Sequence, residues 1–255
     1  MHLGLVTYNL ARDWDLDLLL QRCAETGLES VELRTTHAHG VEPTLGAAER
    51  RAVRARLAAS PVRLIGIGTV CEFHALKPEV VEANVQAACA AIELAADLDC
   101  PGVKVRPNGH QERAGVPRAT TLEQIGRALA RCGERAASLG VAVRLEMHGG
   151  VAEARDIAGI LAACGHPAVE VCWNCNAVDV KAGSVADDFA LLRGRIGLVH
   201  IQELWSPDYP WRELFRLLRE SGYGGHCLAE IPSSPDPVRV LRFYRALFDQ
   251  LAGPA

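Results

Sequence analysis

The feature that most constrains the fold of this chain is an alternation of short β-branched runs with longer segments that repeat apolar residues every three or four positions. The alternation occurs eight times in 255 residues. The predicted strands are residues 3–8, 30–34, 62–68, 102–106, 141–147, 168–174, 196–202 and 226–231. Helices are expected after them, from Asp13 or Asp15 to Gly27, around 46–59, from Pro78 through Ile92, from Leu122 to Leu139, up to Cys164, around 184–193, from Trp211 to Glu220 and around 237–251.

Strands that alternate with single helices pair in parallel through right-handed crossovers. Eight such units in this length predict an α/β fold, a single (β/α)8 TIM barrel, as one domain over residues 1–255. An open doubly wound sheet is the alternative. It is disfavoured because the first strand is followed by Tyr8-Asn9-Leu10-Ala11 and not by a glycine-rich dinucleotide fingerprint.

Charge and cysteine usage exclude several classes of protein. The formal net charge is −4, and the 27 basic residues are scattered, so nucleic acid is not expected as a partner. The N-terminus does not resemble a signal peptide and no long uncharged apolar stretch occurs, so we expect no membrane partner and a cytoplasmic location. The nine cysteines lie in apolar surroundings and are expected to be reduced. Cys172 and Cys175, three apart on one strand, should face opposite sides.

The strand phase predicts which side chains enter the barrel. Outward side chains must be apolar to meet the helices, so the alternate residues point inward. The inward polar set is Glu32, Arg34, Lys104, Arg106, Arg144, Glu146, His148, Glu170, Cys172, Asn174, His200, Gln202 and Glu230. Buried charges must pair, bind an ion or face a wet pocket. Glu32, Arg144 and Glu170 lie further from the strand ends and are expected to form structural ion pairs.

Four members of that set lie at or near the C-terminal ends of four consecutive strands, where the side chains converge. They are Glu146, Asn174, His200 and Glu230. A single inward histidine or amide usually forms hydrogen bonds with the backbone. Four inward polar side chains at the ends of neighbouring strands instead favour a binding site. Three oxygen ligands and one imidazole suit one divalent metal ion, with Mn²⁺ the first choice and Mg²⁺, Co²⁺ or Zn²⁺ the alternatives.

The same residues carry a family resemblance. LEMHGG (145–150), VCWNCNAVD (171–179), LVHIQEL (198–204) and LAEIPSS (228–234) resemble the strand-end motifs of the xylose isomerase-like barrels, the sugar-phosphate isomerase/epimerase group. The resemblance implies one divalent metal held by Glu146, Asn174, His200 and Glu230, and proton transfer between adjacent sugar carbons with Glu146 and Glu230 as acid and base. The family usually has Asp where this chain has Asn174, and Asn176 is a further candidate for that role.

The first half of the chain is expected to shape the substrate site. The predicted substrate contacts are Tyr8, Arg34, His74, Lys104, Arg106 and His148. Lys104 is expected near the reacting carbons and Arg34 at the far end, unless glutamates already neutralise them. His37 and His39 are expected to be loop residues and not ligands. The inward acidic and basic side chains have equal numbers of charges, so a bound metal ion would give the barrel interior a net positive charge. Such a site favours an anionic sugar or polyol as substrate, and a neutral polyol is the alternative.

The function predicted from these residues is a metal-dependent sugar, sugar-phosphate or keto-polyol isomerase or epimerase that moves a proton next to a carbonyl. Three alternatives stay open. A lyase or dehydratase of a keto-polyol or keto acid begins with the same proton abstraction. An apurinic-site endonuclease needs a trinuclear zinc site and a cationic face, which the acidic charge disfavours. A non-catalytic sugar-binding homologue is the third, and a homo-oligomer is compatible with every one of them.

Overall fold

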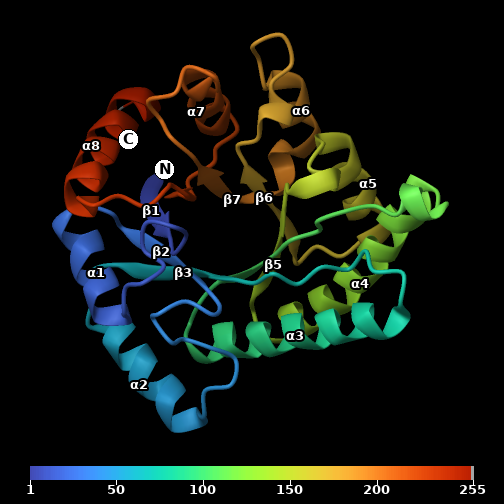
Figure 1. Cartoon of the computed structure of the whole chain (residues 1–255), viewed down its shortest axis with the longest axis horizontal. Helices are drawn as coiled ribbons and strands as arrows, with labels where there is room; N and C mark the ends of the chain where they lie inside the picture. Colours follow the sequence, from blue (N-terminus) through green and yellow to red (C-terminus); the bar gives the residue numbers. More distant parts are fainter. Residues whose placement is uncertain (254–255) are drawn as a thin grey trace.

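The computed structural model describes residues 1–253 and contains a closed barrel of eight parallel strands in chain order, with the α-helices around it (Figure 1). The strands are β1 (His2–Val6), β2 (Ser30–Arg34), β3 (Arg63–Gly68), β4 (Gly102–Val105), β5 (Ala142–Glu146), β6 (Val169–Asn174), β7 (Ile196–Ile201) and β8 (His226–Ala229). The helices are α1 (Leu16–Glu25), α2 (Ala47–Ala58), α3 (Pro78–Asp97), α4 (Arg118–Ser138), α5 (Ala154–Cys164), α6 (Ala186–Leu192), α7 (Trp211–Glu220) and α8 (Pro237–Ala252). The predicted (β/α)8 fold is confirmed.

Several boundaries differ from the sequence prediction, and three of them bear on the site or its support. Helix α4 begins at Arg118 and not at Leu122. The Arg118 guanidinium pairs with Asp156 of α5, and this contact between helices supports a first turn that the apolar pattern does not mark. Strands β1 and β8 end earlier than predicted, so Tyr8 and Glu230 lie just beyond strand ends. Both side chains therefore sit at the rim of the barrel, where functional groups of this fold are found.

The interior of the barrel contains a small apolar cluster. Val6, Ile65, Cys172, Leu198 and Leu228 are buried and form a cluster separate from the main core between strands and helices. Cys175 belongs to that main core, so Cys172 and Cys175 do face opposite sides as predicted. All nine cysteines are free.

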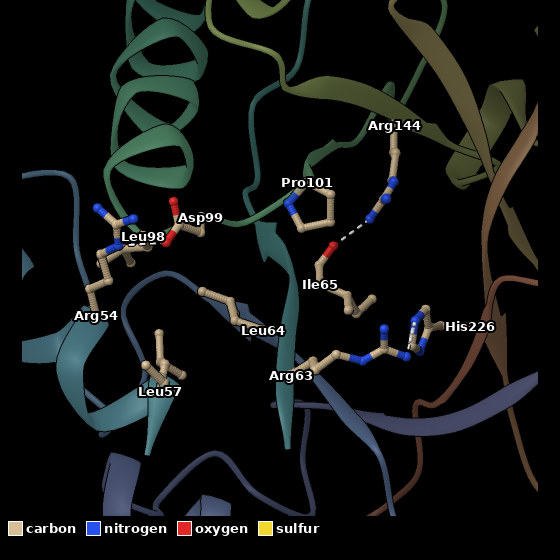
Figure 2. Close-up of a pocket in the computed structure, with 11 residues that line it drawn as sticks. Arg54, Leu57, Arg63, Leu64, Ile65, Leu98, Asp99, Pro101, Arg144 and His226 are labelled. Carbon is tan, nitrogen blue, oxygen red and sulfur yellow. Dashed lines mark hydrogen bonds and ion pairs between the residues drawn. The ribbon is translucent and has the colours of Figure 1, made fainter. Parts of the chain in front are cut away.

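The N-terminal end of the barrel holds a cavity of about 410 Å³ (Figure 2). Its charged groups already have partners: Arg63 Nη2 is 3.3 Å from His226 Nε2, and Arg144 donates to the carbonyl of Ile65. Arg144 Nε also lies 3.5 Å from Glu170 Oε2, which confirms the structural ion pair predicted for these two residues. This end therefore contributes to stability, as is usual for the fold.

Over residues 1–253, no helix is both long enough and apolar enough to cross a bilayer.

Candidate active site

The opposite end of the barrel, at the C-terminal ends of the strands, holds a polar cavity of about 210 Å³. Most of the predicted site residues line it, namely Tyr8, Arg34, Lys104, Arg106, Glu146, His148, Asn174 and Glu230. His200 is fully buried beside them. His74 is the exception among the predicted substrate contacts, because it lies outside the lining, with Nδ1 3.8 Å from Glu72 Oε2.

Three predicted ligands converge at the floor of this cavity. Glu146 is the last residue of β5, His200 lies one residue before the end of β7, and Glu230 follows β8. Each offers one ligand atom, and these atoms all lie within 4.8 Å of one another. A spacing of this kind is compatible with ligation of a single ion by two carboxylates and an imidazole.

Asn174, the last residue of β6, completes the predicted set. It is in register with His200 of β7. Its Nδ2 donates to Glu146 Oε1 at 3.3 Å, whereas its Oδ1 is buried and has no hydrogen-bond partner. Asn176 lines the same cavity, and its amide nitrogen donates to the carbonyls of Met147 and Asn174.

His200 is oriented by the buried carboxylate of Glu32. Its Nε2 lies 3.4 Å from Glu32 Oε2, which leaves Nδ1 3.3 Å from Glu146 Oε1 and 3.9 Å from Glu230 Oε2. Glu32 is therefore buried in an ion pair, as predicted, and its partner is His200 of the converging set. A carboxylate on the far nitrogen of a histidine fixes its tautomer and presents the other nitrogen as a ligand.

The sequence of β3 makes room for Glu32. A Cβ at Gly68 would lie 2.6 Å from Glu32 Oε1, and one at Gly66 would lie 2.9 Å from Glu32 Oε2. Both distances are shorter than real Cβ contacts allow, so glycine is required at these positions for Glu32 to reach His200.

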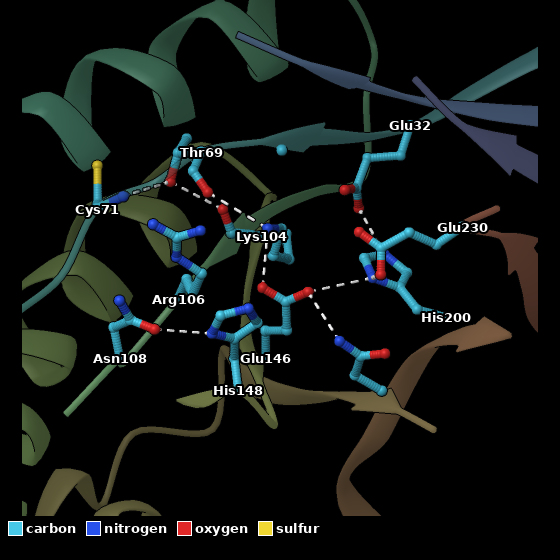
Figure 3. A network of polar contacts seen from close by, with 12 residues as sticks. Glu32, Thr69, Cys71, Lys104, Arg106, Asn108, Glu146, His148, His200 and Glu230 are labelled. Carbon is cyan, nitrogen blue, oxygen red and sulfur yellow. Dashed lines mark hydrogen bonds and ion pairs between the residues drawn. The ribbon is translucent and has the colours of Figure 1, made fainter. Parts of the chain in front are cut away.

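Lys104 of β4 forms an ion pair with Glu146, one of the predicted metal ligands, in addition to lining the substrate cavity. Its Nζ donates to Glu146 Oε2 at 2.9 Å and to the carbonyl of Thr69 at 3.3 Å (Figure 3). Burial would lower the pKa of Lys104, but Glu146 and Glu32 outweigh that effect and raise it. The lysine therefore remains a cation beside the carboxylate cluster.

The two candidate acid/base glutamates differ electrostatically. Burial would raise the pKa of Glu146, but Lys104 and His200 lower it well below its usual range. Burial raises the pKa of Glu230, and the charge of Glu146 adds to the rise. Burial would also lower the pKa of His200, yet Cys172 and Glu32 raise it well above the ordinary value. Environments that separate two carboxyl pKa values in this way are typical of acid/base pairs.

The rim of the cavity contains a second ion pair that the strand phase did not predict. Arg106 Nη2 lies 3.0 Å from Oε1 of Glu72, which comes from the loop after β3. Beside it, His148 Nδ1 is 2.8 Å from Asn108 Oδ1 (Figure 3). Glu72 could not be found from periodicity, because a loop residue has no strand phase.

Arg34 closes the other side of the cavity. Its guanidinium lies over the Tyr8 ring, 5.3 Å from the centroid, and its carbonyl accepts a 2.7 Å hydrogen bond from His39 Nε2. His39 is thus a loop-structuring residue, as expected. Burial and the charge of Arg34 lower the pKa of the neighbouring His37 to about 4.

Unsatisfied buried atoms give a second reason, independent of the sequence motifs, why these four residues fit a divalent ion. Among the buried side-chain atoms without a hydrogen-bond partner are Asn174 Oδ1 and His200 Nδ1. Buried polar atoms are rarely left unsatisfied, and both atoms belong to residues of the converging set. An ion at this position would satisfy them together with the two glutamates.

The sequence model of the xylose isomerase-like TIM barrel family matches residues 20–247. No curated protein sequence matches the chain. Among solved structures, D-psicose 3-epimerase from Clostridium cellulolyticum H10, in complex with D-tagatose, superposes with a TM-score of 0.82 at 13% identity, over 100% of both chains.

Two further structures are similar over nearly their whole length. The 3-keto-D-glucoside 4-epimerase of E. coli superposes with a TM-score of 0.81 at 16% identity, over 98% of this chain and 99% of that one. The IolI protein with a bound zinc atom superposes with a TM-score of 0.78 at 12% identity, over 99% of this chain and 98% of that one. At such identities the similarity establishes the fold. The family match, which spans most of the sequence, shows that the chain belongs to the xylose isomerase-like TIM barrel family.

Proposed function

We propose that this protein is a divalent-metal-dependent isomerase or epimerase of a small sugar or polyol, which moves a proton at a carbon next to a carbonyl. The observation that carries the proposal is the convergence of Glu146, His200 and Glu230 at the mouth of the barrel, joined by the unpartnered Oδ1 of Asn174. The similarity to two sugar epimerases and to a zinc-containing barrel supports it.

Glu146, Asn174, His200 and Glu230 would hold the ion, with Mn²⁺ as the first choice. A bound divalent ion acts as a Lewis acid that polarises a carbonyl and acidifies the neighbouring C–H. Glu32 is proposed as the positioning residue, because its contact at 3.4 Å keeps the His200 ring oriented toward the ligand cluster.

The two glutamates are proposed as the acid/base pair. One carboxylate removes the proton from the substrate carbon, and the other carboxyl group returns a proton to the substrate. Lys104, 2.9 Å from Glu146, stabilises the ionised form of that carboxyl and lines the cavity, where it can donate to a substrate oxygen. His148 and Tyr8 line the same cavity and are proposed as further substrate contacts. His74 stays a prediction without a contact to the cavity.

The test is hydrogen exchange with solvent. The Mn²⁺-loaded protein is incubated in D₂O with a panel of ketoses, inosose-like polyols and their phosphates, and deuterium at the carbon next to the carbonyl is followed by NMR. We expect exchange and a new isomer in the parent and neither in Glu146→Gln nor Glu230→Gln. Glu153→Gln, a change at an exposed carboxylate outside the cavity, is the matched control.

The same experiment separates the alternatives. A product that has lost water would identify a lyase or dehydratase. Binding of a sugar without exchange across the panel would identify a non-catalytic homologue, and the proposal of an isomerase or epimerase would then be wrong.

A further inference from the structure

The cations that line the active-site cavity differ in how they are neutralised. Lys104 Nζ is 2.9 Å from Glu146 Oε2, and Arg106 Nη2 is 3.0 Å from Glu72 Oε1. Arg34 lines the same cavity, yet within residues 1–253 it forms no ion pair with a carboxylate and its guanidinium donates no hydrogen bond. An arginine in a polar cavity with all its side-chain donors unused is poised for an anionic group.

Arg34 is also held in place before any ligand arrives. Its backbone N–H donates to Thr7 Oγ1 at 2.7 Å, and its carbonyl accepts from His39 Nε2 at 2.7 Å. The Tyr8 ring supports the guanidinium, and Gly68 leaves space for the stem, since a Cβ there would lie 2.9 Å from Arg34 Cγ. A side chain fixed in this way loses little conformational entropy when it binds a ligand.

The charge of the whole site points the same way. Its carboxylates are Glu32, Glu72, Glu146 and Glu230, and its cations are Arg34, Lys104 and Arg106. Four negative and three positive charges leave one negative charge, and the divalent ion of the proposed function would turn this into one positive charge. Since Lys104 and Arg106 are paired with carboxylates, the excess positive charge lies at Arg34. A ligand that displaces water from the cavity must neutralise this charge.

We propose that the substrate of this site is an acidic sugar or polyol, one that carries a carboxylate or a phosphate, and that Arg34 binds this anionic group at the end of the substrate away from the reacting carbons. The inference rests on the proposed function for the identity of those carbons. The positive surplus rests on the metal ion of that function as well, whereas the unpaired Arg34 is a property of the cavity itself. Carboxylate and phosphate share the chemistry that a guanidinium recognises through two parallel hydrogen bonds.

The experiment measures binding and not turnover. Titration calorimetry compares D-gluconate with D-glucitol, and D-fructose 6-phosphate with D-fructose, on the Mn²⁺-loaded parent, Arg34→Gln and Arg34→Lys. Arg63→Gln, at the opposite end of the barrel, is the matched control. We expect the parent to bind at least one anion roughly 10-fold or more tighter than its neutral partner. Arg34→Gln should remove that preference, Arg34→Lys should keep part of it, and Arg63→Gln should keep it whole.

The two pairs separate the sources of the anion, because a preference confined to one pair identifies a carboxylate or a phosphate. Equal binding of anion and neutral partner by the parent in both pairs would overturn the inference, and so would a preference that survives in a folded Arg34→Gln protein. Failure of the proposed function looks different. If the parent prefers the anion, the preference depends on Arg34 and no deuterium exchange occurs, the inference holds and the proposed function fails. If a neutral ketose exchanges deuterium and the parent shows no preference for the anion, the proposed function holds and the inference fails.

Discussion

Replacement of Lys104 by methionine should strongly destabilise the protein in the absence of metal. Lys104 and Glu146 are 2.9 Å apart and their side chains are only 3% and 2% exposed. Methionine fills similar space but removes the cation, which leaves a buried carboxylate without its strongest partner. Removal of one partner of a buried ion pair costs about 3–5 kcal/mol. For a domain of this size, such a loss lowers the melting temperature by roughly 10 °C.

The assay is thermal melting and urea unfolding in the presence of a chelator, repeated after reloading with Mn²⁺. Metal bound through Glu146 supplies positive charge in place of the ammonium group, so the loss in Lys104→Met should shrink when the ion is present. Addition of Glu146→Gln to Lys104→Met removes the stranded charge, so the double variant should be more stable than the single one.

Lys181→Met is the matched control. Lys181 Nζ lies 3.0 Å from Asp188 Oδ2, almost the same distance, but the lysine side chain is 46% exposed. Asp188 is only 13% exposed, but because the ammonium group of this pair is in contact with water, its removal should cost only about 1 kcal/mol. A loss of that small size for Lys104→Met in chelator, or a double variant less stable than the single one, would refute the reasoning.

Three further perturbations have expected outcomes. Asn174→Asp should tighten divalent-metal binding in a metal titration, because a carboxylate replaces the amide; unchanged affinity with a lower melting temperature would remove Asn174 from the ligand set. Gly68→Ala should lower the unfolding free energy by about 1–3 kcal/mol in urea, because the new Cβ collides with Glu32; a neutral change would mean that Glu32 needs no such space. Burial raises the pKa of Asp179 from 3.8 to about 7, so its contribution to stability is full below 3.8 and is lost as pH rises through 7. Asp179→Asn should flatten that fall in urea unfolding across this pH range, and an unaltered pH profile would argue against the shift.

The barrel could be predicted from the sequence because two periodicities alternate without interruption. Inward residues followed from the same pattern, since outward positions on a covered strand must be apolar, and this placed Glu146, Asn174 and Glu230 at one cavity. The family match to residues 20–247 agrees with the resemblance seen in the last four strand ends.

The missed features have physical reasons. The strand pattern predicts a buried ion pair for Glu32 but not its partner, because the depth of a residue on one strand does not show which residue of another strand it meets. In a closed barrel the strands are staggered, so residues at different depths along their strands can meet, as Glu32 of β2 meets His200 of β7. Glu72 pairs with Arg106 from a loop, where no periodicity reveals the direction of a side chain. The start of α4 depends on the contact of Arg118 with α5, which is tertiary.

Four strand-end residues are proposed to hold one divalent ion. The most direct test of this proposal is elemental analysis of the protein after chelation, reloading with Mn²⁺, Co²⁺ or Zn²⁺ and removal of free ion, for the parent and for His200→Ala. The account predicts about one ion per chain in the parent and none in a folded His200→Ala protein. A parent without stoichiometric metal, or a variant that retains as much metal as the parent, would contradict it.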